Sequence, residues 1–383
     1  MAENGAKNLT AAAIQKAPFP AFGGKSSISA DAWRRLGDVR NYVEPFVFSA
    51  AMLLNRPQPF SGTETINDIN GYVANFWRAV QRDPEAVAAA ADSPVNENDL
   101  HAWHAWLVER KESLVAKLEG DPEFFDPLIA GKWCWGQCCW IGSGWCSGEG
   151  PWHVVEVDGA RQLVHLGDAG RGVNRQLVHL GGAGRGVNRK LVHLGNAGQG
   201  VNRQRVHLGD AGQANEPEAC GVSRKRPLIT NDSVGVASHS GISAWMAALA
   251  DRLRFVRVCC GDWSRVCGPT PTVKQGLTAV FFDPPYSGET GRAKVYGHTE
   301  DMSVAHDVRK WCLENGADKR LRICLAGYAG EHDELEAHGW DVFRWKARGG
   351  FGSQRADGAN ENAKRERLWF SPHCVKPERR LFQ

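Results

Sequence analysis

Segments with the pattern of short strands alternate with helical segments near both ends of the chain, and this order constrains the fold more than any other feature. In the N-terminal part, residues 41–54 predict a short strand, a loop and the start of a helix. A second strand over 63–70 ends in acidic and amide residues and precedes a helix over 71–91. Alternating strands and helices are typical of an α/β sheet with crossover connections.

The same alternation resumes after residue 241. The expected elements, in order, are a helix over 242–253, a strand and turn over 255–263, a buried strand running into a proline turn over 277–288, a helix over 300–315, a strand, loop and short helix over 321–340, and closing strands within 341–350 and 364–372. The sequence therefore predicts one sheet whose two halves are separated by an insertion.

The insertion has two parts. Residues 93–160 predict helices rich in tryptophan, and the tryptophans from Trp133 to Trp145 are expected either in a core or stacked on bases. Residues 161–214 contain four units with a period of 14, each with a short extended piece and a glycine-rich turn, which either stack as strands or stay loosely ordered. The repeated histidines form one polar strand face or a metal ladder: His165, His179, His193 and His207. The expected organisation is thus 18–92 and 241–383 for the two halves of the sheet domain, with 93–160 and 161–214 between them.

Charge is distributed unevenly along the chain. The net charge is +3, yet the repeat over 161–214 holds eight basic and two acidic residues, +6, which leaves −3 for the remainder. Any electrostatic attraction to nucleic acid is therefore expected to be local, and the repeat is either a source of nonspecific DNA affinity or a tolerated surface insertion.

The composition also indicates in which cellular compartment the protein is expected. The chain shows no apolar run of signal-peptide or membrane-spanning length, so secretion and membrane insertion are not expected. Eleven scattered cysteines suit a reducing cytoplasm. The tightest group lacks the paired C-x-x-C of a structural zinc site and predicts either buried thiols or a metal or redox role: Cys134, Cys138, Cys139 and Cys146.

The motif Asp283-Pro284-Pro285-Tyr286 follows the apolar strand TAVFF directly. Ligands of open α/β sheets bind at the carboxyl ends of strands, so a site is expected here. The two prolines lack N–H groups and fix the chain, which holds the Pro284 carbonyl outward as an acceptor beside the Asp283 carboxylate. Two such acceptors match the two hydrogens of an exocyclic amine, and Tyr286 offers a ring on which a base can stack.

This motif resembles the D-P-P-Y motif of the amino-methyltransferases that act on DNA bases. Four further motifs resemble, in order, those of the Dam-type N6-adenine DNA methyltransferases, especially phage and prophage enzymes. The resemblance covers most of the chain apart from the first residues and the repeat. It implies a Rossmann-like S-adenosylmethionine-dependent methyltransferase sheet with an inserted, mainly helical target-recognition subdomain, followed here by the glycine-rich repeat.

The resemblance also implies which residues bind S-adenosylmethionine. The segment PFPAFGGK resembles the family's G-G-K motif, which packs against the methionine part of the cofactor, and Lys25 can meet a carboxylate. In the second-strand motif INDIN, the acidic residue is expected to accept both ribose hydroxyls, and in VCCGDW an aspartate is expected to bind the adenine amine beside a tryptophan. The implied cofactor residues are Phe22, Gly23, Gly24, Lys25, Glu44, Pro45, Phe46, Asp68, Asp262 and Trp263.

The stretch EPFVFSAAMLL departs from the family pattern E-P-F-x-G-S-G-A. Phe48 and Ala50 stand where that pattern has glycines, which permit positive φ or close approach to a ligand. The Phe48 ring must therefore either fill cofactor space or turn toward the core. The first outcome would weaken cofactor binding and leave a catalytically impaired DNA-binding relative.

The expected function is thus methyl transfer to the N6 amine of an adenine flipped out of double-stranded DNA, by a cytoplasmic monomer or weak dimer of a bacterium or phage-infected cell, with no metal. Target recognition is expected in the insertion, whose arginines can contact phosphates. The alternatives are a DNA-binding protein with a dead site, a methyltransferase for RNA or protein glutamine, and a repeat-based interaction module. Asp283 favours a nucleobase as the substrate over a protein glutamine, because enzymes that resemble this one and methylate glutamine usually have asparagine at this position.

Overall fold

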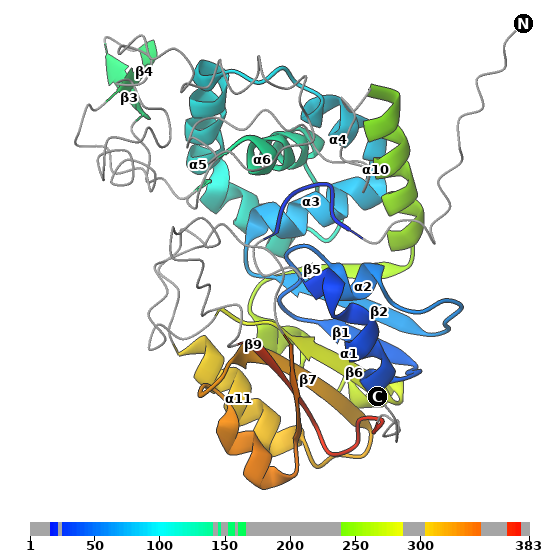
Figure 1. The fold of residues 1–383 in the computed structure, drawn as a ribbon. Helices are drawn as coiled ribbons and strands as arrows, with labels where there is room; N and C mark the ends of the chain where they lie inside the picture. The colour runs from blue at the N-terminus through cyan, green and yellow to red at the C-terminus, as the bar shows by residue number, and fades with distance from the viewer. Residues whose placement is uncertain are drawn as a thin grey trace, which may run out of the picture.

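In the computed structural model, residues 16–21, 25–140, 145–146, 152–157, 160–165, 239–285, 303–345 and 366–376 are described. Seven strands form one mixed sheet in the order β5-β2-β1-β6-β7-β9-β8 (Figure 1). Their bounds are β1 Asn41–Glu44, β2 Thr63–Asp68, β5 Val256–Cys260, β6 Thr278–Phe282, β7 Leu321–Tyr328, β8 Asp341–Arg344 and β9 Glu366–Phe370. Strands β5, β2, β1, β6 and β7 are parallel, whereas β9 is antiparallel to both of its neighbours. The predicted α/β sheet, split by an insertion, is confirmed.

The helices follow the predicted order, except that the first helix, over Ser29–Leu36, is not predicted and that the helix expected over 71–91 is divided. They are α1 Ser29–Leu36, α2 Ala51–Leu54, α3 Gly71–Arg82, α4 Pro84–Ala91, α5 Glu97–Gly120, α6 Pro127–Cys139, α10 His239–Leu253 and α11 Val304–Asn315. The single helix expected over 71–91 is wrong, because the chain breaks at Asp83. Proline cannot continue a helix but fits its first turn, so Pro84 begins α4, and the Asp83 side chain caps it by accepting from the Ala86 N–H.

Alternate side chains of each strand pack on opposite faces of the sheet, as the strand period of two requires. On one face, Tyr42 and Phe281 join a large core with α1, α2, α3, α6 and α10. On the other face, Val43, Phe282 and Trp369 pack with residues of α11. Both faces are therefore buried, as expected for parallel strands connected by helices.

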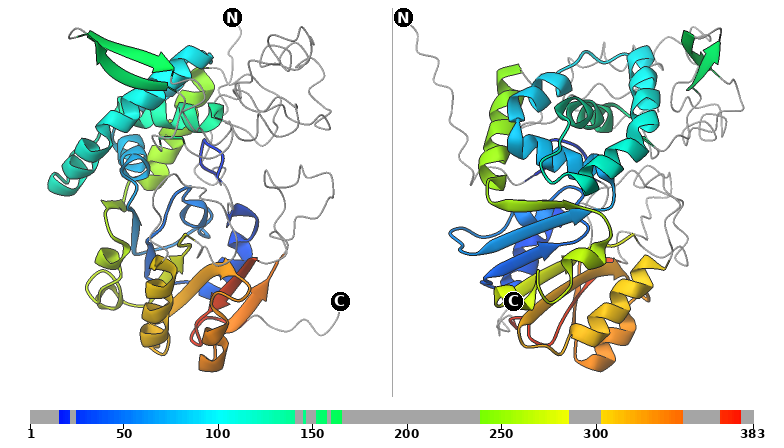
Figure 2. Two further views of the ribbon diagram at one scale, coloured as in Figure 1. Left: turned by 90° about the vertical axis from the view of Figure 1, so that its left-hand side faces the viewer. Right: turned by 180° about the vertical axis from the view of Figure 1, so that it is seen from behind.

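Helices α3 to α6 and α10 lie together above the sheet in the view of Figure 1, and α11 lies at the lower left, beside strands β7 and β9. Figure 2 shows the same layers from the side and from behind. Of the two placements that the sequence leaves open for the tryptophans from Trp133 to Trp145, the structure shows the core: Trp133, Trp135 and Trp145 are buried, and Trp140 packs against them partly buried. Cys134, Cys138, Cys139 and Cys146 are buried free thiols, the first of the two alternatives that the sequence leaves open for them.

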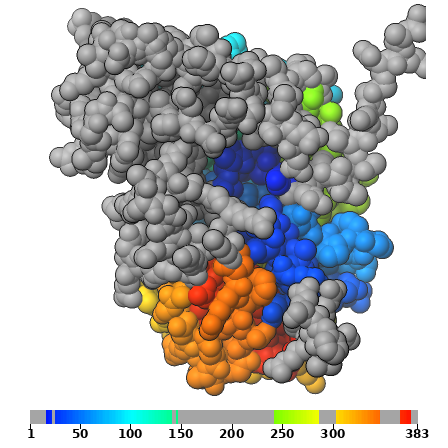
Figure 3. Space-filling model, in the orientation of Figure 1, coloured from blue at the N-terminus to red at the C-terminus, as the bar shows by residue number. Residues whose placement is uncertain are grey.

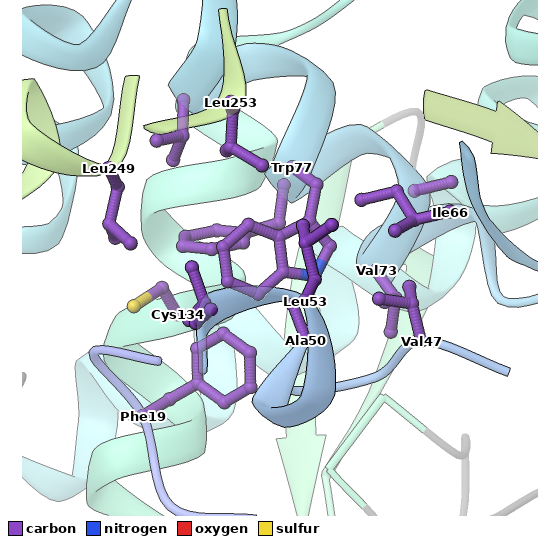
Figure 4. Packing of buried hydrophobic residues seen from close by; sticks show 14 of the residues in the cluster. Phe19, Val47, Ala50, Leu53, Ile66, Val73, Trp77, Cys134, Leu249 and Leu253 are labelled. Carbon is purple, nitrogen blue, oxygen red and sulfur yellow. The ribbon is translucent and has the colours of Figure 1, made fainter. Parts of the chain in front are cut away.

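The N-terminal segment 16–21 packs into this helical layer. Phe19 lies against the rings of Phe76 and Trp133, at centroid distances of 5.2 and 4.9 Å. Figure 4 shows Phe19 beside Cys134 of α6, near Trp77 and Ala50. In the space-filling view, N-terminal residues reach the surface near the centre of this face (Figure 3).

The edge strand β5 is covered by side chains. Its carbonyls at alternate positions accept hydrogen bonds from Gln81, Arg78 and Arg265, with donor–acceptor distances of 2.9, 3.3 and 3.2 Å to Val256, Val258 and Cys260. An open edge invites pairing with another chain, and these donors occupy the acceptors it would use.

The insertion is described only in part. A short antiparallel hairpin is formed by β3 Trp152–Val157 and β4 Ala160–His165, and β4 contains the first extended piece of the repeat. The remaining repeat units and the first 15 residues lie outside the described residues. Among the helices that are described, none combines the length and apolar character needed to cross a membrane.

Candidate functional site

The strand order reverses between β1 and β6, which makes this the topological switch point of the sheet. In open α/β sheets, ligands bind outside the carboxyl ends of the strands at such a point. The segment Glu44-Pro45-Phe46 begins at the last residue of β1, and Asp283-Pro284-Pro285 follows directly after β6. The structure therefore places two of the predicted motifs side by side, at the position where a ligand is expected.

Lys25 pairs with Asp283 across this point. The Lys25 Nζ lies 2.9 Å from Asp283 Oδ2; the lysine side chain is 5% exposed and the aspartate side chain 27%. A short 3-10 helix over Lys25–Ser27 positions the lysine. The resemblance implies that Lys25 meets a carboxylate of the ligand, whereas in the structure Lys25 pairs with the protein's own Asp283. The two motifs lie more than 250 residues apart in the sequence, yet they form one ion pair.

Glu44 is buried beside this pair. Its Oε2 accepts hydrogen bonds from the Tyr42 hydroxyl at 2.8 Å and the Leu53 N–H at 3.1 Å. Burial raises the pKa of Glu44 to about 8, and the negative charge of Asp283 raises it further, while the two hydrogen bonds act in the opposite direction. Glu44 is therefore mainly neutral at pH 7.

Asp68 ends β2, the neighbour of β1. Its two oxygens accept hydrogen bonds from the main-chain N–H groups of Phe48, at 3.0 Å, and Asn70, at 2.9 Å. The residue is partly accessible, but burial of the carboxyl raises its pKa to about 6 against the lowering effect of these two bonds. The next residue, Ile69, is 66% exposed. Sequence reasoning missed this apolar surface, although an isoleucine after the acidic end of a strand is a usable signal.

Asp262 and Trp263 follow β5. Asp262 is exposed and caps the 3-10 helix Trp263–Val266 by accepting from the Ser264 N–H at 2.9 Å. The Trp263 ring lies 6.4 Å from Phe46 and 5.8 Å from Phe282, measured between centroids. The structure therefore brings Phe46 and Trp263 together, partly buried against the core on the α11 face.

Asn67 of β2 links the turns that follow β1 and β5. Its buried side-chain amide donates to the carbonyls of Pro45, at 3.1 Å, and Gly261, at 2.9 Å. Sequence reasoning missed this residue, because only its position next to Asp68 marks it. Asn67 fixes the spacing between the ends of β1, β2 and β5, on which the predicted site residues lie.

The backbone conformation shows how Phe48 and Ala50 are accommodated where the family pattern has glycines. Phe48 and Ala50 have φ values of +31° and +51°, so both adopt the left-handed region that glycine favours. The Phe48 ring lies 5.7 Å from that of Phe19 and 6.4 Å from that of Trp133. Of the two outcomes that the sequence leaves open, the structure shows the second: the ring turns toward the core.

Four predicted residues lie outside the part of the chain that the structure describes: Phe22, Gly23, Gly24 and Tyr286. A scan of protein-family models and a search of the curated proteins found no match to this chain. The geometry of the switch point therefore carries the functional argument.

The raised pKa of Glu44 predicts a pH dependence of stability. The folded chain keeps the Glu44 proton up to about pH 8, whereas an unfolded chain loses it near 4.5, so folding becomes less favourable as pH rises between these values. We expect Glu44→Gln to gain stability relative to the native chain across this range, by up to about 1.4 kcal/mol per pH unit. Urea unfolding at pH 5 to 8 measures the difference.

Comparing the two chains is essential, because buried His332 acts in the opposite direction. Burial lowers the pKa of His332 to about 3, so its contribution to stability increases with pH up to about 6.5 in both chains. A difference between Glu44→Gln and the native chain that stays constant with pH would contradict the assignment.

Proposed function

We propose that this protein is a DNA methyltransferase that transfers a methyl group from S-adenosylmethionine to the N6 amine of an adenine. The observation that carries the proposal is the meeting of the separate sequence motifs at one switch point, with Lys25 on Asp283 and Asp68 two strands away. The order β5-β2-β1-β6-β7 supports it, since it corresponds to the order 3-2-1-4-5 of nucleotide-binding sheets.

The described residues fit the proposed cofactor. Asp68 presents a partly accessible carboxylate at the end of β2, suited to the ribose hydroxyls. Ile69 is exposed beside it, and the Phe46 and Trp263 rings supply apolar surface for the adenine. When bound, the cofactor supplies an electrophilic methyl group.

Asp283 and the Pro284 carbonyl then hold the target amine. A carboxylate has about four lone-pair sites, so Asp283 can accept an amine N–H while paired with Lys25. The ion pair fixes the direction of the carboxylate, and the prolines restrict the backbone that carries it. Catalysis on this proposal is mainly positioning of the amine in line with the methyl group.

The target adenine must leave the duplex to reach such a site, at a cost of about a few kcal/mol. We assign target recognition to the insertion, with the helices within 93–160 near the sheet edge and the +6 repeat available for phosphate contacts. Double-stranded DNA is the proposed partner of a monomer or weak dimer in the cytoplasm.

The second candidate is a DNA-binding relative with an impaired cofactor site, and Phe48 and Ala50 are the observation that favours it. The ring contacts of Phe48 weigh against this candidate, because they point the side chain toward Phe19 and Trp133.

Calorimetric titration with S-adenosylmethionine tests the proposal. We expect the unmodified chain to bind with a Kd in the micromolar range, and Asp68→Ala to lose at least tenfold in affinity because the ribose acceptors are removed. Asp31 on α1, which is partly exposed and pairs with Arg34, provides the control variant Asp31→Ala, which should bind like the native chain. Absence of heat at millimolar cofactor, with DNA binding intact, would favour the second candidate.

A further inference from the structure

Three groups of Phe48 make contacts that hold it in place: its N–H, its carbonyl and its ring. Its N–H donates to Asp68 Oδ2 at 3.0 Å, and its carbonyl accepts from the Trp77 indole N–H at 2.8 Å. Its ring packs edge-on against Phe19 and Trp133. The backbone bonds and the ring contacts thus anchor the same residue to the sheet, to α3, to the N-terminal segment and to α6.

The backbone conformation explains why such anchoring matters. At a φ of +31°, the Cβ of an L residue lies too close to the neighbouring main chain, and glycine alone avoids this cost. A residue other than glycine persists there only when its surroundings compensate. The aromatic contacts of Phe48 provide this compensation, since edge-on ring pairs are attractive beyond the area they bury.

We propose that the Phe48 ring is a positioning group for the Asp68 carboxylate: it holds the turn after β1 so that the Phe48 N–H stays on Asp68. The inference rests on the proposed function in so far as Asp68 binds the cofactor ribose. In this protein an anchored aromatic replaces the conformational freedom of glycine. Phe48 contacts no reacting atom on this proposal and acts through Asp68.

The proposal predicts an unusual order for a series of substitutions. In Phe48→Gly the anchor is lost, but the backbone adopts positive φ without cost, so the N–H can remain on Asp68. In Phe48→Ala the anchor is lost and the unfavourable conformation remains, so the turn relaxes and releases Asp68. Cofactor affinity should therefore be lowest for alanine, with phenylalanine and glycine both higher.

Two simpler roles of Phe48 give different orders. If the ring obstructs the cofactor, affinity rises steadily from phenylalanine to alanine to glycine. If the ring contributes only to packing of the core, both variants melt at lower temperature, while the affinity of the folded protein for the cofactor does not change. The order of the three affinities thus separates the positioning role from obstruction and from simple packing.

The experiment titrates the native chain, Phe48→Gly and Phe48→Ala with S-adenosylhomocysteine at a temperature where all are folded. We expect Phe48→Ala to bind at least tenfold more weakly than the native chain, and Phe48→Gly to stay within about threefold of it. Val47→Ala is the matched control, because Val47 is a buried core residue of the same turn, and its affinity should match that of the native chain. Either of the other two orders overturns the proposal.

A second measurement needs no cofactor. Carboxyl NMR titration follows Asp68, whose pKa of about 6 is held down in part by the Phe48 N–H, and this pKa should rise in Phe48→Ala but not in Phe48→Gly. If the native chain binds no S-adenosylhomocysteine, the proposed function fails, while the Asp68 titration still decides whether Phe48 positions this carboxylate. An unchanged Asp68 pKa in Phe48→Ala overturns the inference.

Discussion

Replacing Asp283 by alanine is expected to lower methyl transfer to DNA adenine by at least about 10²- to 10³-fold, the usual loss when one well-placed polar partner of the reacting group is removed. The reason is geometric. Asp283 lies directly after β6 at the switch point, where its carboxylate accepts one hydrogen of the target amine on the proposed mechanism. Methylation of adenine in a defined duplex, measured under single-turnover conditions, reports this loss.

The same substitution also removes the ion pair with Lys25, whose side chain is only 5% exposed. A hydrogen bond to a charged group contributes about 1.5–3 kcal/mol, so Asp283→Ala should also unfold more readily. Lys25→Met combined with Asp283→Ala should recover that stability without recovering methylation. This double variant separates the role of Asp283 in folding from its role in the reaction.

Asp318→Asn is the matched control for Asp283. Asp318 lies in the turn before β7, at the amino ends of the parallel strands and so opposite the carboxyl ends where Asp283 lies. Its ion pair with Arg320 is exposed. Surface pairs of this kind contribute about 0–1 kcal/mol, so methylation should be unchanged. If Asp283→Ala and Asp318→Asn methylate DNA equally well, the role assigned to Asp283 is wrong.

The local pattern of the sequence predicts the strands of the seven-stranded sheet, whereas β3 lies in the range 93–160, for which helices are expected, so that expectation is wrong there. The motif after TAVFF is correctly expected at a carboxyl strand end, because chain order alone fixes that relation. The helix over 71–91 failed for a local reason: helical pattern before the break and alanine-rich sequence after it outweighed the break that Asp83 and Pro84 impose.

Contacts between distant segments could not be predicted in this way. The pairing of Lys25 with Asp283 depends on how the N-terminal segment crosses the sheet, which no spacing in the sequence encodes. Asn67 is similarly unmarked, because its role arises only when the turns after β1 and β5 lie beside β2. The direction of the Phe48 ring depends on Phe19 and Trp133, which belong to two other segments of the chain.

Glu64→Ala is expected to cause the largest loss of stability, about 3–5 kcal/mol, because it leaves two buried guanidinium groups without their shared anion. Glu64 lies on β2, and its oxygens bind Arg56 at 3.1 Å and Arg252 at 2.7 and 2.8 Å. All three side chains are at most 6% exposed. Both guanidinium groups also lie over the Phe60 ring. Urea unfolding of the variant and the native chain at equal pH measures the loss.

Glu123→Ala provides the comparison, since Glu123 also pairs with an arginine, Arg82, at 2.9 Å but is 72% exposed. Solvent screens such a pair, so this variant should lose no more than about 1 kcal/mol. Equal losses in the two variants would contradict the burial on which the prediction depends.

The position of Arg252 gives the Glu64 variant a second, local consequence. Arg252 lies on α10, the first described helix after the insertion, and it also donates to the Leu53 carbonyl at 2.7 Å. This cluster therefore connects the returning chain to the first half of the sheet across 188 residues. In Glu64→Ala, hydrogen exchange should accelerate in 239–253 more than in α11, which packs on the other face of the sheet. Acceleration spread equally over both helices would show that Glu64 supports the whole fold rather than the attachment of α10.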